Sequence, residues 1–488
     1  MKNKGNLSAC VGQCPDFDAW FTAFFLKNSL DPFAYPTKVG SKEQIEFMVF
    51  LENEERYFPC SDEMFEIIMS RKYPPFLKKQ YQQVLDKTMA MIDELIDSDY
   101  ENRFLKALIK IKYDDEIRTC LLIPSRLEKK LHKIFLSRTH IENPYSEDKE
   151  LINRKIKNCI DSETVKKALN QIDDSLQTIQ NLSLFEIREK IKEIEFQRRL
   201  TLITQNSLWA HENSKIPLLS KIKKIFKTPI KGNGLAPLMA LVKARKQKIL
   251  WLADESSEVV VDLTIAKFLA DLGHAVIFAV KEAPFFKKVC LADTRTDPVL
   301  VKILETAHFI HEKTISKNNL VKLLKHDKNI YVVSDGTREN LNLLLVSTTF
   351  SRIFKEVDCV ISRGNIQKKR LIDTHFRFTQ NIINISLDKK TLMITYKPKH
   401  PSFIKFSHKD LEEKANQIID QMESAKNKGM TIMFYSGIIG SIPGKIDVAK
   451  KIMSTFINYL HKKSSDLFII NPSFHYEPGM DADDLMYM

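Results

Sequence analysis

The sequence predicts an α/β fold, in which a mostly helical N-terminal domain precedes a mainly parallel, doubly wound, Rossmann-like sheet. From residue 248 onward, short apolar runs alternate with amphipathic helical segments, as in successive βαβ units. Between residues 76 and 210, apolar side chains recur mostly at three- and four-residue spacing, which is typical of helices. A chain of 488 residues also exceeds one ordinary hydrophobic core, so we expect two domains.

The predicted sheet begins in the stretch Lys248 to Asp293. Ile249 to Leu252 is a short apolar run, as expected for a strand that is buried on both faces. A helical segment follows and ends near Gly273, and Ala275 to Val280 is the next apolar run. This order is that of a strand, a helix and a second, parallel strand.

Acidic side chains follow several of the predicted strands. Asp254 and Glu255 come directly after the first strand, while Asp293 and Asp335 lie at or just past the ends of later ones. Ligands of open parallel sheets bind beyond the carboxyl ends of the strands. We therefore expect a site for a hard cation such as Mg²⁺ or Mn²⁺, which would polarise a phosphoryl oxygen. The alternative for each acid is a carboxylate that is merely favoured near a helix N-terminus.

Further elements are expected along the chain. Ser183 with Glu186 forms a capping box that predicts the start of a helix. The remaining strand candidates are residues 329–333, 359–362, 431–435 and 467–470, and the intervening helices include residues 340–354 and 447–461.

These patterns divide the chain into three parts. Residues 1–214 are expected to form the helical domain, residues 215–247 a basic linker and residues 248–488 the α/β domain. From Lys215 to Lys248 there are ten basic residues and no acidic one, interrupted by prolines and glycines. This stretch is either a solvated hinge or a surface that contacts nucleic-acid phosphates or an anionic membrane.

Charge and cysteine usage indicate the class of partner and the compartment. The net charge of +13 suggests an acidic partner, such as nucleic acid, an anionic membrane surface or a phosphorylated ligand. The alternative is a basic, soluble protein from a lysine-rich proteome, whose charges are simply solvated. The seven cysteines are scattered, as in a reducing compartment. Neither a signal peptide nor a transmembrane run is apparent, so we expect a cytoplasmic protein.

A glycine-rich loop near the C-terminus is a second candidate site. The strand at 431–435 leads into a loop that contains Gly440 and Lys445. Backbone amides in such a loop, backed by a helix N-terminus, form a cradle for phosphate or carboxylate. The spacing is not that of a P-loop, and the alternative is a plain flexible turn.

Several spaced motifs resemble those of the metal-dependent damage-control phosphatases, a family that includes the acidic-residue methyltransferase-like proteins. Asp254, Glu258 and Asp262 fall in register with that family's acidic motif after a strand, and Lys281 with Pro284 match the next motif. Ser334-Asp335-Gly336-Thr337 and the run from Asp358 to Arg363-Gly364 match two more, so that the resemblance covers roughly residues 248–371.

The resemblance implies roles for these residues. It implies catalytic roles for Asp254, Glu258 and Lys281, with Lys281 pairing with Asp254. It also implies a divalent metal (Mn, Co, Ni or Mg) bound by Asp254, Glu255 and Asp293. It further implies that Ser334, Asp335, Arg363 and Gln367 bind the substrate phosphate. The glycine-rich loop adds Gly440 and Lys445 as further candidates for phosphate binding.

Two departures from the family pattern bear on activity. Glu255 stands in place of an asparagine ligand, and the third ligand position falls at Lys288 or Val289, neither of which binds a divalent cation. Asp293 lies close enough in sequence to substitute, whereas Lys288 would place an ammonium where the metal sits.

These features leave three functional hypotheses. The first is a metal-dependent hydrolase of phosphate monoesters of small metabolites. The second is a non-catalytic ligand-binding or scaffold protein that keeps the fold without the metal. A protein carboxylate methyltransferase is a weaker alternative, because no glycine-rich loop of the usual S-adenosylmethionine-binding kind is present.

Overall fold

The computed structural model describes most of the chain. The described residues are 12, 14–52, 55–72, 74–171, 183–203, 217–244, 246–254, 256–325, 329–401, 408–435, 446–464, 466–475 and 480.

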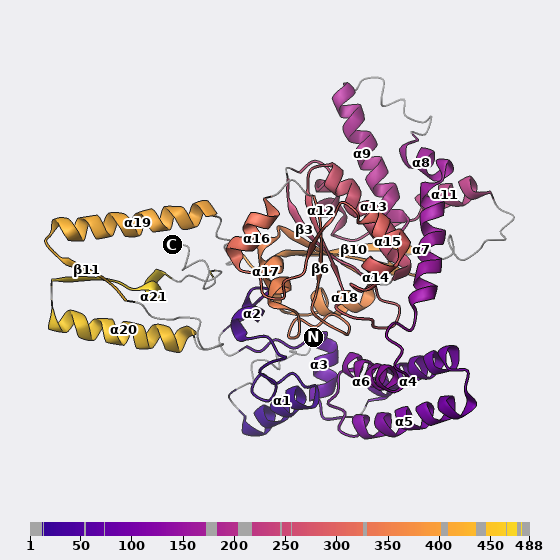
Figure 1. Ribbon diagram of the computed structural model, residues 1–488, viewed down its shortest axis with the longest axis horizontal. Coiled ribbons are helices and arrows are strands. Elements are labelled where there is room, and N and C mark those ends of the chain that lie inside the picture. Colours follow the sequence, from indigo (N-terminus) through magenta and orange to yellow (C-terminus); the bar gives the residue numbers. More distant parts are fainter. Residues whose placement is uncertain are drawn as a thin grey trace, which may run out of the picture.

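The centre of the molecule is an eight-stranded sheet with the order β2-β10-β9-β7-β3-β4-β6-β5 (Figure 1). All neighbouring strands pair in parallel except β9 and β10, so β2 and β10 run opposite to the rest. The predicted α/β fold with a mainly parallel sheet is therefore confirmed. The strands are β2 (Ile230–Lys231), β3 (Lys248–Leu252), β4 (Ala275–Val280), β5 (His308–Ile310), β6 (Ile330–Ser334), β7 (Cys359–Arg363), β9 (Asn381–Asp388) and β10 (Thr391–Lys397).

Helices cover both faces of this sheet, and the alternation along β3 shows how. Leu250 and Leu252 point into one hydrophobic core, whereas Ile249 and Trp251 point into the other. The first core also contains apolar residues of the N-terminal helices α1 (Pro15–Lys27), α2 (Lys42–Glu46), α3 (Asp62–Met69), α4 (Pro75–Leu95), α5 (Asp99–Ile117) and α6 (Pro124–Thr139), and of α16 (Lys317–Leu324) and α17 (Thr348–Glu356). The second contains residues of α7 (Ser146–Asp161), α8 (Glu163–Asn170), α9 (Leu184–Thr201), α11 (Leu218–Phe226), α12 (Leu235–Ala240), α13 (Ser256–Asp271) and α15 (Pro298–Ile303).

The N-terminal helices thus share cores with the sheet. The capping box predicted at Ser183 and Glu186 is confirmed at the start of α9. His375, which follows the last helix of the sheet region, hydrogen-bonds Asp62 and Glu55 of the N-terminal region at 2.8 and 3.0 Å. Although burial alone lowers the pKa of His375, these two carboxylates raise it to about 9. The small antiparallel pair of β1 (Val49–Phe50) and β8 (Arg377–Phe378) joins the same two regions.

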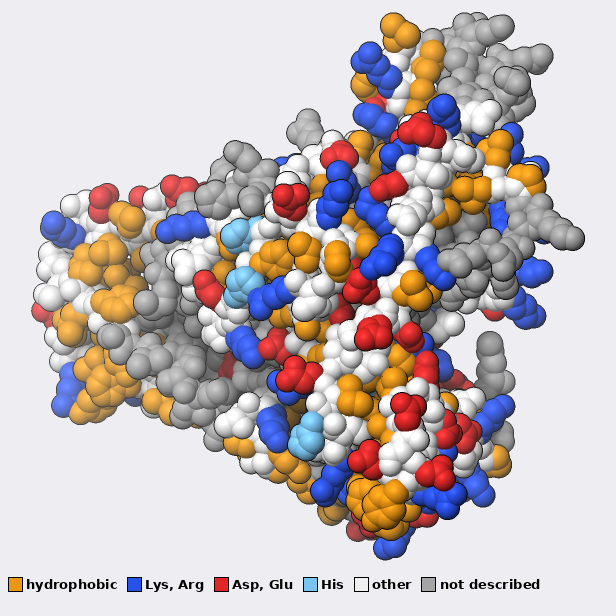
Figure 2. Space-filling model, turned by 45° about the vertical axis from the view of Figure 1, so that its right-hand side comes forward, with side chains coloured by type: hydrophobic (Ala, Val, Ile, Leu, Met, Phe, Trp, Pro, Cys, Tyr) orange, Lys and Arg blue, Asp and Glu red, His pale blue; other side chains and the backbone are white. Residues whose placement is uncertain are grey.

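The stretch expected to be a basic linker contains three short elements. They are α11, β2 and α12, and Ile222 and Leu238 are fully buried in the second core. The apolar residues of these elements alternate with lysines and pack into the second core, so they hold this basic segment against the sheet domain. On the face shown in Figure 2, Lys and Arg side chains are interspersed with Asp and Glu rather than gathered over one element.

The C-terminal segment forms a separate unit beside the sheet domain. It consists of α19 (His408–Asn427), β11 (Thr431–Phe434), α20 (Ile446–Lys463), β12 (Leu467–Ile470) and α21 (Pro472–His475), and lies at the left of Figure 1. The predicted strands at 431–435 and 467–470 pair in parallel with each other, not with the central sheet. Within the described residues, none of the helices combines the length and the apolar character needed to cross a bilayer.

Candidate functional site

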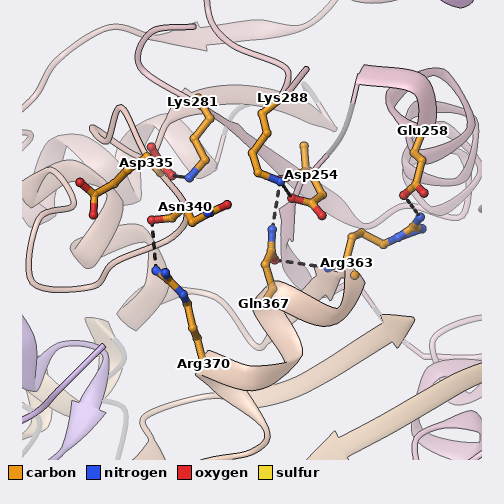
Figure 3. A network of polar contacts seen from close by, with 12 residues as sticks. Asp254, Glu258, Lys281, Lys288, Asp335, Asn340, Arg363, Gln367 and Arg370 are labelled. Atoms are coloured by element: carbon orange, nitrogen blue, oxygen red, sulfur yellow. Dashed lines mark hydrogen bonds and ion pairs between the residues drawn. The ribbon is translucent and has the colours of Figure 1, made fainter. Parts of the chain in front are cut away.

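Asp254 lies where the sheet predicts it, just beyond the carboxyl end of β3. Its carboxylate is buried, and its Oδ1 accepts a hydrogen bond from Nζ of Lys288, which is only 3% exposed. Figure 3 shows the two side chains pointing toward each other. Lys288 follows β4, the strand next to β3, so the topology itself brings the two charges together. Lys288 therefore places its ammonium beside Asp254.

Glycine at position 364 allows Asp254 to occupy this place. Gly364 begins α18 (Gly364–Leu371) with φ of +78°, a backbone conformation that L side chains rarely adopt. A Cβ at this position would lie 2.7 Å from Oδ2 of Asp254. The carboxylate is thus held between Lys288 and the first residue of a helix.

Gly364→Ala is expected to destabilise the protein more than Gly273→Ala. Both positions have positive φ, but a Cβ at Gly273 meets no described atom within 4 Å. The methyl group at 364 adds overpacking against Asp254, worth about 1–3 kcal/mol beyond the shared backbone strain. Urea unfolding of the two variants measures the difference, and equal losses of stability would contradict the placement of Asp254 against Gly364.

Arg363, the last residue of β7, is wholly buried. Its guanidinium donates to Oε2 of Glu258 at 2.5 Å and to Oδ1 of Asp262 at 3.0 Å, both on α13. Burial raises the pKa of Asp262 to about 7 although Arg363 opposes the shift. Arg363 was expected to hold a substrate phosphate, but its guanidinium is bound by the carboxylates of Glu258 and Asp262.

A further buried ion pair joins Lys281 and Asp335. Nζ of Lys281 donates to Oδ2 of Asp335 at 2.5 Å and to Oγ1 of Thr337 at 3.2 Å. Burial lowers the pKa of Lys281 and raises that of Asp335. Lys281 therefore pairs with Asp335 and not, as the resemblance implied, with Asp254. Ser334 lies beside this pair, where its Oγ accepts from the backbone N–H of Gly336.

Gln367 ties α18 to the ends of two strands. Its Oε1 accepts from the backbone N–H of Arg363 at 3.3 Å, and its Nε2 donates to the carbonyl oxygen of Ala253 at 3.2 Å. The side chain is 4% exposed and holds the helix in place beside Asp254.

Asp293 is bonded elsewhere. Its carboxylate accepts from Nζ of Lys149 at 2.7 Å, from Nδ2 of Asn143 at 2.9 Å and from the backbone N–H of Cys290 at 2.8 Å. These contacts join the segment around α7 to the turn after β4. Of the other predicted site residues, Glu255, Gly440 and Lys445 lie outside the described residues.

Arg370 is a buried residue near these side chains that was not singled out from the sequence. It lies one helical turn after Gln367 on α18, and its guanidinium donates to the carbonyl oxygen of Asn340 at 3.1 Å (Figure 3). It also donates to Oγ of Ser125 at 2.6 Å. The three-residue spacing from Gln367 places both side chains on one helix face, and that spacing is the signal from which Arg370 was predictable.

Comparison with known proteins shows the family. The protein-family model for the damage-control phosphatase ARMT1-like domain matches residues 68–401, which is more than half of the chain. The chain belongs to the ARMT1-like damage-control phosphatase family. Among solved structures, this ARMT1-like chain is similar to a DUF89-family protein from Pyrococcus horikoshii, with 18% sequence identity and a TM-score of 0.44 over 64% of this chain and 96% of that one. No curated protein matches it in sequence.

The ARMT1-like region contains the sheet and most of the N-terminal helices. It begins within α3 and ends after β10, so the unit from α19 to α21 lies outside it. The resemblance inferred from the spaced motifs is therefore confirmed at the level of the family.

The metal that this ARMT1-like family implies does not fit the described residues around Asp254. An ammonium, not an oxygen ligand, faces the carboxylate, and a divalent cation placed there would be repelled by Lys288. Asp293 is engaged by Lys149 and Asn143. Among the residues that the structure describes, no group of three or more His, Cys, Asp or Glu side chains is arranged to hold a metal ion.

Proposed function

We propose that this protein binds a phosphorylated small molecule without a divalent metal, as a non-catalytic member of its family. The observation that carries the proposal is the buried ion pair of Lys288 and Asp254, in which an ammonium stands beside the carboxylate expected to hold the metal. Such a pair neutralises the carboxylate internally, and a cation could replace it only by breaking a buried charge contact. Membership of a phosphatase family supports a phosphorylated ligand.

Metal-dependent hydrolysis of phosphate monoesters is the second candidate. Asp254 and Glu258 are present in the register of the family's acidic motif, and Asp254 lies at the carboxyl end of β3, where parallel sheets bind ligands. The loss of an independent oxygen ligand at Lys288 argues against this activity.

Assays with phenyl phosphate and a panel of sugar phosphates test the proposal. Each substrate is incubated with Mn²⁺, Co²⁺, Ni²⁺ or Mg²⁺ and with EDTA, and ligand affinity is measured by calorimetry under the same conditions. We expect at least one phosphate ester to bind equally well with metal and with EDTA, and no metal-dependent turnover. Turnover that requires a metal and is abolished in Asp254→Asn would overturn the proposal in favour of the phosphatase.

A further inference from the structure

A pocket of about 420 Å³ lies between α18 and the N-terminal helices. Arg370 and Ile366 of α18 form one wall, and Phe76, Gln83 and Val84 of α4 form the facing one. The turn before α3 and the start of α6 contribute the remaining sides. Ile366 and Arg370 lie on either side of Gln367 in the sequence of α18, and Gln367 hydrogen-bonds Ala253, the residue before Asp254. The pocket therefore lies next to the region around Asp254.

Arg370 differs from Arg363 and Arg126, which are also buried, in having no carboxylate within ion-pair distance among the described residues. It is 6% exposed, and its guanidinium hydrogen-bonds the carbonyl oxygen of Asn340 and the hydroxyl of Ser125. By contrast, Arg363 pairs with Glu258 and Asp262, and Arg126 pairs with Glu339. The two contacts of Arg370 use two of the five N–H donors of a guanidinium, and the described residues bring no carboxylate within ion-pair distance of it.

Acidic side chains at the pocket are mostly neutralised by other partners. Glu128 accepts from Lys87 and from Asn340, both at 2.7 Å, and Asp373 pairs with Lys368. Glu63 is exposed at the rim. Glu339 and Glu128 attract the guanidinium of Arg370, but neither lies within ion-pair distance of it. A negatively charged ligand in the pocket would therefore be the first anion in direct contact with this buried cation.

Apolar side chains contribute to both walls of the pocket. Phe76 is 41% exposed and Ile366 is 39% exposed, and Met64 and Val84 also line the pocket. A ligand held only by charge, such as a free phosphate, would leave these surfaces in water. The lining instead matches a molecule with an anionic end and an apolar body.

We propose that this pocket binds a small organic phosphate, with its phosphate group on Arg370 and an aliphatic or aromatic body between Phe76 and Ile366. The choice of phosphate over other anions rests on the function proposed above. The pocket also assigns a role to the N-terminal helices, which supply the wall that recognises the body of the ligand.

The test measures binding of phenylphosphonate, a phosphate analogue that cannot be hydrolysed at an ester bond, by calorimetry in EDTA. Arg370→Gln removes the cation, and Gln83→Trp fills the pocket from an exposed position of α4 without disturbing a core. Gln82→Trp is the matched control, since Gln82 is the exposed neighbour that does not line the pocket. We expect a loss of about tenfold to a hundredfold in affinity for each of the first two variants, and no change for the control. Methylphosphonate, which lacks the apolar body, is expected to bind about tenfold or more weakly than phenylphosphonate.

Affinity that is unchanged in both Arg370→Gln and Gln83→Trp would overturn this pocket assignment alone, because metal-independent binding would persist at another place. Absence of binding of every phosphate and phosphonate to the native chain would overturn both proposals. If Arg370→Gln does not fold, the comparison of Gln83→Trp with Gln82→Trp decides the assignment.

Discussion

Lys288→Asp is expected to give a protein that binds Mn²⁺, whereas the native chain does not. The substitution removes the ammonium beside Asp254 and supplies an oxygen ligand in its place. In EDTA the variant should lose about 3–5 kcal/mol of stability, because a buried carboxylate loses its partner and gains a like charge. Mn²⁺ at a hundredfold excess over its dissociation constant should restore about 2.7 kcal/mol.

Thermal unfolding in EDTA and in Mn²⁺, together with calorimetric titration of the metal, measures both effects. Lys287→Asp is the matched control, because Lys287 is half-exposed and pairs with Glu94 and Asp148 rather than with Asp254. Stabilisation of the native protein by Mn²⁺ to the same extent as the variant would show that Lys288 does not exclude the metal.

Arg363→Met is expected to cost about 3–5 kcal/mol of stability, since it leaves Glu258 and Asp262 on α13 without their cation in a dry environment. Oδ2 of Asp262 is already buried with no hydrogen-bond partner in the described part of the chain. Urea unfolding measures the loss.

A control and a rescue make this result specific. Arg103→Met removes an exposed ion pair with Asp99 and should change stability by less than about 0.5 kcal/mol. Adding Glu258→Gln and Asp262→Asn to Arg363→Met should recover part of the loss, because the uncompensated charges are then removed. A variant as stable as the native protein, but unable to bind a phosphate ester, would instead support the phosphate-binding role that the resemblance implied for Arg363.

The strands that are buried on both faces were predictable from local sequence. The apolar run Ile249–Leu252 and the fully buried run Ala275–Val280 are β3 and β4, since strands buried on both faces are apolar throughout. The β9–β10 hairpin was not predicted. Its two strands follow each other without an intervening helix, which departs from the strand–helix alternation of the preceding region.

Site partners were less predictable than site positions. The position of Asp254 follows from the end of β3, and an ammonium at Lys288 followed from the family spacing. That Lys281 pairs with Asp335, and that Arg363 lies between two acids of α13, depends on the order of strands in the sheet. Sequence spacing predicts ion pairs within one helix, but it does not predict which opposite charges on different strands and helices will meet.

The two-sided core has a consequence for the synthesis of the chain. Helices α1–α9 cover parts of both faces of the sheet, yet all of them precede β3 in the sequence. At about 5–20 residues per second, the roughly 100 residues from the start of α7 to β3 take about 5–20 s to emerge from a ribosome. During that interval Phe196 and Ile156 have no strand to pack against. A nascent chain of this protein is therefore expected to depend on chaperones until β3 and β4 are exposed, and premature termination before them should yield aggregates rather than a stable helical fragment.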